Sequence, residues 1–279
     1  MIPFLHIWRL TIPTFGLMVA LAMLVSFYIL RTDLSRRGVA KKDSGLAEAF
    51  IAIPCLAGIV GAKLYHVLET PRDLIADPLG QIFSQYGFAW LGGLIAGVAA
   101  FVWLARRSGV PLMTMLDAGS PAAAAGYGVG RIGCLLSGDG DYGVPTSLPW
   151  GMSFPNGIVP TSQRVHPTPI YELIVACLIS VVLWKLGKRQ LARASAQRDN
   201  SSRPQKPRPP LPGDESAGVV FAAYLVLTGL ARFLVEFIRI NPRSFLGMTN
   251  AQVGSLASIV AGCVIYWLHQ KRRRPGAVK

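Results

Sequence analysis

The chain has 279 residues, of which 52% are apolar and only 15% are charged, and its formal net charge is +14. Soluble domains carry about 25% charged residues, so this composition excludes an ordinary soluble protein and favours one that crosses a membrane several times. The basic residues lie in gaps between apolar runs rather than on one face of a soluble domain, which excludes a nucleic-acid partner.

Seven apolar runs are long enough, or nearly so, to cross about 30 Å of hydrocarbon. They cover residues 13–30, 47–68, 88–105, 112–136, 169–187, 218–238 and 250–268. The sequence therefore predicts an all-α polytopic membrane protein, a single integral membrane domain over residues 1–279 with seven transmembrane helices. The fourth run is rich in Ala and Gly, which suits close helix packing, and a re-entrant or broken helix is the alternative there.

Basic residues fall in every second gap between these runs. Residues 31–46, 106–111 and 185–217, together with the C-terminal tail, hold 20 of the 28 Lys and Arg residues. Cytoplasmic loops carry such an excess, so we expect a multi-pass protein of the plasma membrane with its N-terminus outside and its C-terminus in the cytoplasm.

Two segments outside the spans differ in composition from the rest. Residues 138–168 are rich in Pro, Gly and aromatic side chains, which argues against a helix and predicts a small extracytoplasmic cap. Residues 193–216 are rich in Pro, Ser and Arg and poor in apolar residues, which predicts a disordered basic cytoplasmic linker.

The cysteines give no sign of a metal site. Cys55, Cys134, Cys177 and Cys263 all lie in apolar runs without paired spacing, so we expect buried small hydrophobic residues rather than disulfides or zinc ligands. The glycines of GVGRIG (128–133) end an apolar run without a βαβ context, so they are not a nucleotide-binding loop. We expect neither a metal nor a cofactor.

A glycine-rich segment at the outer end of the fourth run places a charge among close-packed backbone. GYGVGRIGCLLSGDGDYG (126–143) contains Arg131, followed by Asp139 and Asp141. An arginine at this depth must pair with a carboxylate or with an anion such as a lipid phosphate. An Arg–Asp pair that only locks the loop to the helices is the structural alternative.

The sixth run carries a second cluster of charges at its outer end. In GLARFLVEFIRI (229–240), Arg232 and Glu236 are four residues apart and share a helical face, with Arg239 three residues further on. A mutual ion pair would leave one arginine free for a lipid headgroup. The alternative is a structural salt bridge, with Arg239 extended outward.

Three weaker signals complete the set of candidate residues. Arg164, His166 and Glu172 are the polar anchors of the cap, and His66 lies near the outer surface, where it either anchors the second span or accepts a proton. Gly92 and Gly93 form a small-residue face for helix packing. Two arginine-bearing spans that end on the same side, beside glycine-rich turns, predict a pocket for an anionic lipid head entering from the outer leaflet.

At these residues the chain resembles the prolipoprotein diacylglyceryl transferase family. The resemblance rests on PTFGL (13–17), GGLIAG (92–97), GRIGCLLSGDGDYG (130–143), RVHPTPIYE (164–172) and TGLARFLVEFIR (228–239), in the family's order. It implies an enzyme of the bacterial inner membrane that transfers a diacylglyceryl group from phosphatidylglycerol to the lipobox cysteine of prolipoproteins. A thioether would form and glycerol 1-phosphate would leave.

The resemblance also assigns residues. The family's two essential arginines fall on Arg131 and Arg232, and its acidic residues fall on Asp139, where the family more usually has Glu, and Glu236. We expect catalytic roles for these four and for His66. Residues expected at the substrate-binding site are Gly92, Gly93, Gly130, Gly133, Gly143, Arg164, His166 and Arg239.

Three positions depart from the family pattern. Leu91 stands where a His is common, Phe15 where a Tyr is common, and Cys134 where an Asn is usual. The general base is therefore open among His66, Asp139 and Glu236. A catalytically silent lipid-binding or accessory protein on the same scaffold is the second hypothesis. A transporter is the third, although its midplane charges are missing.

Overall fold

The computed structural model describes residues 1–8, 10–39, 45–84, 87, 89–199, 217–244 and 246–273. Long helices dominate it. They are α1 (Thr14–Arg36), α2 (Leu46–Glu69), α5 (Trp90–Ser108), α6 (Leu112–Ser137), α7 (Thr168–Asp199), α8 (Val219–Val235) and α9 (Asn250–Arg273). Each of the seven apolar runs is thus a helix, and α6 is continuous through Pro121 rather than broken.

Five of these helices, α1, α2, α5, α7 and α9, are long and apolar enough to cross a membrane. The apolar helix α8 is shorter, with 17 residues. α6 has 26 residues but carries Asp117 and Arg131 and buries much of its surface. The polytopic helical architecture expected from the sequence is therefore present.

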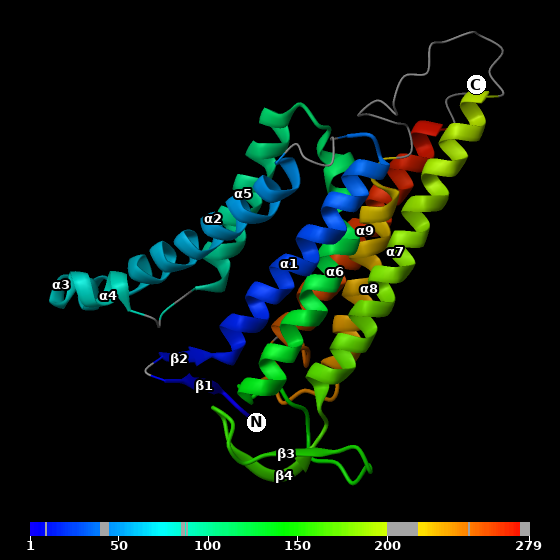
Figure 1. Cartoon of the computed structure of the whole chain (residues 1–279). Helices are drawn as coiled ribbons and strands as arrows, with labels where there is room; N and C mark the ends of the chain where they lie inside the picture. The colour runs from blue at the N-terminus through cyan, green and yellow to red at the C-terminus, as the bar shows by residue number, and fades with distance from the viewer. Residues whose placement is uncertain are drawn as a thin grey trace.

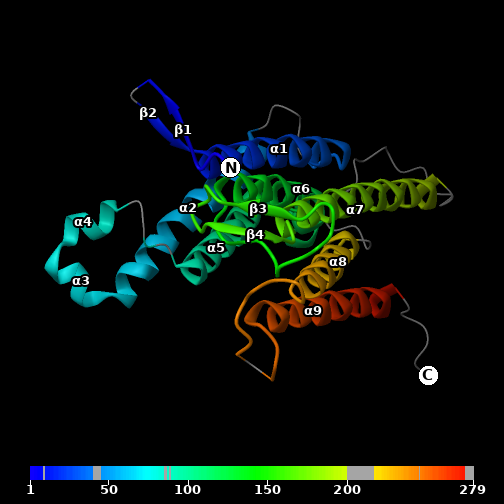
Figure 2. The same ribbon diagram turned by 90° about the horizontal axis from the view of Figure 1, so that it is seen from below.

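The helix α6 is the centre of the bundle. It contacts α1, α5, α7 and α8, while α9 packs against α8 and α2 packs against α5. In Figure 1 the pair α2 and α5 diverges from the main bundle and leads to the short helices α3 (Pro71–Ala76) and α4 (Pro78–Phe83). Figure 2 shows α8 and α9 on the opposite flank. The small side chains of α6 allow this central position because they let neighbouring backbones approach closely.

Two β-hairpins lie at one end of the bundle, which we call the hairpin end (Figure 1). β1 (Phe4–Ile7) pairs antiparallel with β2 (Leu10–Pro13), and β3 (Met152–Phe154) pairs antiparallel with β4 (Thr161–Val165). Tyr142 and Phe154 stack at 5.1 Å between ring centroids and give the second hairpin a small core of its own. The predicted non-helical segment is present, but α7 begins at Thr168.

Two expectations need correction. α7 continues to Asp199, so the first part of the predicted linker is helical, and residues 200–216 lie outside the described residues. Cys134 is buried and Cys55 is partly buried, but Cys177 and Cys263 are exposed on the outside of the bundle. Their expected burial is wrong because these two side chains face away from the neighbouring helices.

A buried group of charges joins the helices α1, α6 and α8 at the end opposite the hairpins. Asp33 of α1 pairs with Arg36 and, at 2.9 Å, with Arg37. Asp117 of α6 is fully buried and accepts hydrogen bonds from the backbone amides of Gly218 and Phe221 at 2.9 and 2.8 Å. Since those amides belong to the first turn of α8, Asp117 caps a neighbouring helix.

Candidate functional site: an arginine cluster at the hairpin end

Arg131 lies near the C-terminal end of α6, where the helix reaches the hairpin end of the bundle. Its Nη1 forms an ion pair with Asp141, and its Nε lies 3.4 Å from Oε2 of Glu172. Its Nη2 donates to the Tyr127 hydroxyl at 3.0 Å, one helical turn earlier. Both acidic partners follow Arg131 in the chain, at separations of 10 and 41 residues.

Arg232 reaches the same place from the last turn of α8. Its Nη1 donates to Oε1 of Glu172 at 2.9 Å, and its Nη2 lies 3.0 Å from Oε2 of Glu236. The pairing of Arg232 with Glu236 expected from their spacing is therefore present. The Asn241 amide donates to the other oxygen of Glu236 at 2.5 Å.

Glu172 is the group on which the arginines converge. It stands in the first turns of α7, and its two oxygens receive Arg131, Arg232 and, at 3.3 Å, Nη1 of Arg239. The Tyr127 hydroxyl also donates to Glu172 at 2.5 Å. Arginines from α6 and α8 thus share one carboxylate from α7, which places their guanidinium groups around a common point.

Arg239 completes the group and corrects one expectation. Its Nη2 pairs with Asp141, its Nε lies 3.8 Å from Glu236, and its side chain is 6% exposed. The prediction that one arginine stays free for a headgroup is wrong, as is its outward-extended alternative, because Asp141 and Glu172 supply further charge. We call Arg131, Arg232, Arg239, Asp141, Glu172 and Glu236 the arginine cluster.

A glycine allows the loop after α6 to reach Arg239. Gly143 forms an isolated bridge with Arg239, and the amide of Val144 donates to the carbonyl of Ile238 at 2.8 Å. A Cβ on Gly143 would lie 2.5 Å from that carbonyl oxygen, so a larger residue would push the strands apart. The close approach holds Asp141 beside Arg239.

The cluster is sealed on one side and open on the other. The side chains of Glu236 and Glu172 are 0% and 5% exposed, whereas those of Arg131, Arg232 and Asp141 are 14%, 27% and 30% exposed. Buried carboxylates thus hold the inner faces of the guanidinium groups in place. The open rim lies at Arg131, Arg232 and Asp141.

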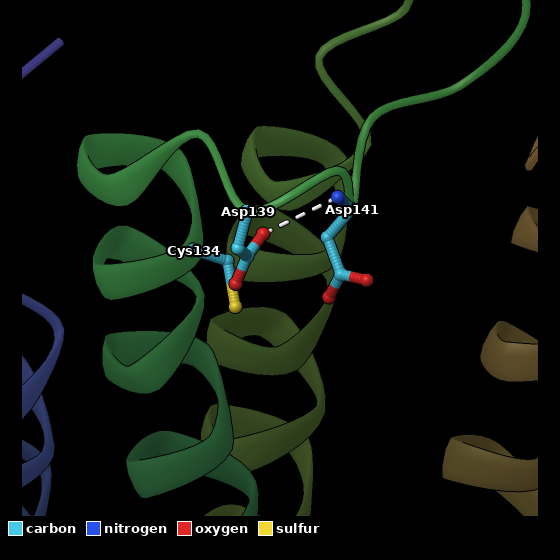
Figure 3. Close-up of side chains that lie close together, drawn as sticks. All are labelled: Cys134, Asp139 and Asp141. Carbon is cyan, nitrogen blue, oxygen red and sulfur yellow. Dashed lines mark hydrogen bonds between the residues drawn. The ribbon is translucent and has the colours of Figure 1, made fainter. Parts of the chain in front are cut away.

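Asp139 and Asp141 stand in the turn just beyond α6, and the carboxylate of Asp139 lies beside Cys134, as Figure 3 shows. The sulfur of Cys134 and one oxygen from each carboxylate lie within 4.8 Å of one another. Asp139 accepts a hydrogen bond from the amide of Asp141 at 3.2 Å. Nη1 of Arg131 donates to the Cys134 sulfur at 3.4 Å, so a guanidinium group already supplies positive charge at this carboxylate pair.

The two aspartates differ in their electrostatics. Burial raises the pKa of Asp139, and the neighbouring charge of Asp141 adds to this rise. Burial also acts to raise the pKa of Asp141, but the guanidinium groups of Arg239 and Arg131 outweigh it and lower that pKa below its ordinary value. Asp141 is therefore held as an anion, while Asp139 takes up a proton more readily.

Other candidate residues from the sequence lie away from the arginine cluster. His66 packs against the loop at Gly87 near the end of α2. Gly92 and Gly93 of α5 pack on Gly61 and Gly58 of α2, which matches the helix-packing role.

The remaining candidates lie nearer to the cluster. Gly133 lets α6 approach Phe15 of α1, and a Cβ on Gly130 would meet open space. Arg164 donates to the carbonyls of Pro149 and Gly151, and His166 lies 3.2 Å from the Tyr171 hydroxyl. Arg164 and His166 therefore shape the second hairpin and the start of α7.

Sequence reasoning missed the contribution of Tyr127 and the roles of two carboxylates. Asp141 and Glu172, rather than Asp139, are the acidic partners of Arg131. Glu172 was a candidate only as an anchor of the cap. A buried acidic residue that begins an apolar span is a signal for a partner charge, but the sequence does not say which arginine it meets.

Helices that suit a membrane, with three arginines and three carboxylates gathered at one end of the bundle, are those of a polytopic membrane protein. The sequence matches the prolipoprotein diacylglyceryl transferase family over residues 3–268. The chain belongs to this family.

Relatives named phosphatidylglycerol–prolipoprotein diacylglyceryl transferase match most of the chain. The protein of Clostridium tetani is 29% identical over 274 residues, which cover 96% of this chain and 98% of the relative. That of Geobacter sulfurreducens is 30% identical over 249 residues, which cover 88% and 84%. The family match, over residues 3–268, includes both arginine-bearing helices and the loop after α6.

Proposed function

We propose that the protein transfers a diacylglyceryl group from phosphatidylglycerol to the lipobox cysteine thiol of prolipoproteins. The thiol sulfur attacks the glycerol carbon that bears the phosphate, a thioether forms, and glycerol 1-phosphate leaves. The observation that carries this proposal is the convergence of Arg131 and Arg232, from two separate helices, on the single carboxylate of Glu172.

A phosphodiester can bind the exposed edges of the same guanidinium groups that the carboxylates bind from the buried side. Like a carboxylate, it carries one negative charge and offers two oxygens that accept paired hydrogen bonds from a guanidinium group. Arg131 and Arg232 are the partly exposed cations of the cluster, so the headgroup reaches them first. The buried carboxylates of Glu172 and Glu236 keep both guanidinium groups oriented before the lipid arrives.

The same arginines assist the chemical step. Negative charge builds on the phosphate as the carbon–oxygen bond breaks, and fixed guanidinium groups stabilise that charge without reorganising. Arg239 is more deeply buried and bound to Asp141 and Glu172, so its role is to hold these carboxylates in position. Gly143 serves the same end through its backbone bridge to Arg239.

We further propose that all seven long helices cross the inner membrane of a bacterium and that the hairpin end faces outward. The helix ends that flank the basic gaps at 31–46, 106–111 and 185–217 lie opposite the hairpins (Figure 1), and the positive-inside bias places such basic gaps in the cytoplasm. Residues 138–167 then form the extracytoplasmic cap. The arginine cluster lies at the outer membrane–water interface, where a phospholipid head is found.

The test is a transfer assay in proteoliposomes that contain phosphatidylglycerol with labelled acyl chains and a lipobox peptide. We expect label to move to the peptide cysteine in wild-type protein. Arg131→Ala and Arg232→Ala should each lower the rate by about 10²–10³-fold, as for the loss of a charge-stabilising donor. Arg107→Ala, near the C-terminal end of α5 where the side chain lies over the ring of Trp103, is the matched control for removal of an arginine.

The outcomes separate the three hypotheses. Transfer by wild type that persists in Arg131→Ala would contradict the proposed site. Binding of phosphatidylglycerol without transfer would favour the silent lipid-binding hypothesis. Uptake of a small solute into the same vesicles, without transfer, would favour a transporter. Growth of a strain depleted of its own diacylglyceryl transferase, when given this protein, is the cellular counterpart.

A further inference from the structure

The proposed reaction needs a group that takes the proton of the acceptor thiol, because the thiolate and not the thiol is the nucleophile. The sequence leaves His66, Asp139 and Glu236 as candidates, and the structure separates them. Glu236 has no exposed side-chain surface and is bound by Arg232 and Asn241. A carboxylate that is fully buried and held in this way has no access to an acceptor thiol.

His66 is not placed to serve the arginine cluster. It belongs to α2, which packs against α5 and α1, and its ring lies against Gly87. The cluster is built on α6, α7 and α8. Leu91 of α5, at the position where the family commonly has His, is an aliphatic residue and cannot accept a proton.

Asp139 has the geometry that the other two lack. Among the residues that the structure describes, it forms no ion pair, in contrast to Asp141 with its two arginines. One of its oxygens accepts the amide of Asp141, which fixes the carboxylate. Figure 3 shows its other oxygen beside the sulfur of Cys134.

The contacts of the Cys134 thiol with Asp139 and Arg131 resemble those that an acceptor thiol needs. A thiol group here lies within 4.8 Å of an Asp139 oxygen and 3.4 Å from a nitrogen of Arg131. An acceptor thiol brought beside Arg131 would meet the same two groups. One is a carboxylate that takes a proton, and the other is a cation that stabilises the resulting thiolate.

From this arrangement, and resting on the proposed function, we propose that Asp139 is the proton acceptor for the lipobox thiol. The atoms balance as follows. The S–H proton moves to an Asp139 oxygen, and the sulfur electron pair forms the new S–C bond. The C–O bond to phosphate breaks with its electrons on oxygen, and the proton then passes from Asp139 to the released glycerol 1-phosphate.

The charge balance of the arginine cluster supports this route. Its three arginines face the three carboxylates of Asp141, Glu172 and Glu236, so their formal charges cancel. A phosphodiester adds one negative charge, and a thiolate would add another. A nearby carboxylate that becomes neutral as the thiolate forms keeps the total charge constant, and burial already favours the neutral form of Asp139.

The experiment is steady-state transfer by Asp139→Asn and Asp139→Glu in proteoliposomes, with a lipobox peptide as acceptor. Asp139→Asn should lower kcat by about 10²–10⁴-fold, the usual contribution of a general base, with the KM for phosphatidylglycerol little changed. Asp139→Glu should restore most of kcat because the carboxylate is kept. The wild-type kcat should fall at low pH as Asp139 is protonated, and Asp139→Asn should lose this dependence.

A selenocysteine lipobox peptide separates chemistry from structure. A selenol ionises at much lower pH than a thiol, so it needs no proton acceptor at neutral pH. The defect of Asp139→Asn should therefore largely disappear with this peptide, whereas a merely misfolded site would remain defective. Asp77→Asn, at the residue whose side chain caps the N-terminus of α4, is the matched control and should behave as wild type.

Two results would overturn the proposal. One is an Asp139→Asn variant with near wild-type kcat, and the other is a defect that is equally large for thiol and selenol peptides. These failures are distinct from a failure of the proposed function, in which wild-type protein transfers nothing to either peptide. The Asp139 variants therefore test the proton acceptor only when the wild-type protein is active in the same assay.

Discussion

The two ends of the bundle each carry paired arginines and carboxylates, but only at the hairpin end is one of these carboxylates partly exposed. At the end opposite the hairpins, the side chains of Asp33 and Asp117 are 0% exposed, and those of Arg37 and Arg36 are 5% and 18% exposed. At the hairpin end, Arg232 and Asp141 are 27% and 30% exposed. The same residue types thus build a sealed network and an accessible one.

This difference shows that the exposure of paired charges inside a membrane protein bears on whether they can bind a ligand. The carboxylates of the sealed network are committed to Arg36, Arg37 and the amides of α8, so the network can only stabilise the packing of its helices. In the arginine cluster the sealed carboxylates hold guanidinium groups whose edges remain exposed. The feature found at the hairpin end alone is a partly exposed carboxylate, Asp141, beside partly exposed arginines, whereas Asp33 and Asp117 are fully buried.

The largest expected effect is a loss of transfer when one of the partly exposed arginines at the hairpin end is removed. Arg131→Ala and Arg232→Ala should lower transfer by about 10²–10³-fold. The melting temperature in detergent should change less than for loss of Arg37, whose side chain is nearly fully buried. Transfer and thermal unfolding measured on the same preparations check this. A loss of transfer that simply follows a loss of folded protein would contradict it.

The next largest effect is a loss of stability when a buried carboxylate at the opposite end is removed. Asp117→Asn leaves Arg37 with less negative charge and removes one strong acceptor from the amides of Gly218 and Phe221. We expect a loss of about 1–3 kcal/mol of unfolding free energy, read as a lower midpoint in denaturant. Transfer by the fraction that stays folded should be close to normal. A larger effect on kcat than on stability would contradict a purely structural role.

A smaller effect comes from the pH dependence of stability. The folded-state pKa of Asp141 is lowered by Arg239 and Arg131 against the opposing effect of burial. Its ionised form therefore stabilises the protein above the ordinary aspartate pKa, and this contribution is lost as the pH falls through the lowered folded-state value. The stability difference between wild type and Asp141→Asn should shrink on acidification. A difference that grows at low pH would contradict the assignment.

The smallest effect sharpens the view of Asp139. The Cys134 thiol donates a hydrogen bond to Asp139. Cys134→Asn introduces the residue that is usual in the family, and its amide can donate to Asp139 in the same way. One hydrogen bond of this kind is worth about 0.5–1.5 kcal/mol, so we expect kcat to change by less than about tenfold. Cys134→Ala removes the donor and should move the acid limb of the pH profile. Abolition of transfer by Cys134→Asn would show a role for the thiol itself.

The sequence predicts much of the helical frame because apolar runs of membrane length have few alternatives. The run at 112–136, for example, corresponds to α6 at Leu112–Ser137. It does not predict the hairpin of β1 and β2 or the helices α3 and α4, which follow short and weakly patterned segments. Boundaries such as the end of α7 are also missed because polar residues continue a helix beyond the membrane.

For the site, the local pair of Arg232 and Glu236 follows from helical spacing. The role of Glu172 does not, because it joins residues separated by 41 and 60 positions in the chain. The sealed network is likewise absent from the sequence interpretation, although Asp117 within an apolar run is the kind of residue that requires a partner. A charged residue within a span indicates that a partner exists, but only the folded structure shows which residue that partner is.

The most direct test of the central claim is a double-mutant cycle on Arg131 and Arg232, measured as kcat/KM for phosphatidylglycerol. If both guanidinium groups hold one phosphate, removal of the first also removes most of the contribution that the second makes to kcat/KM. We therefore predict that the double variant Arg131→Ala with Arg232→Ala loses little more than either single variant. Losses that multiply fully would mean that the two arginines act independently, and would contradict the account.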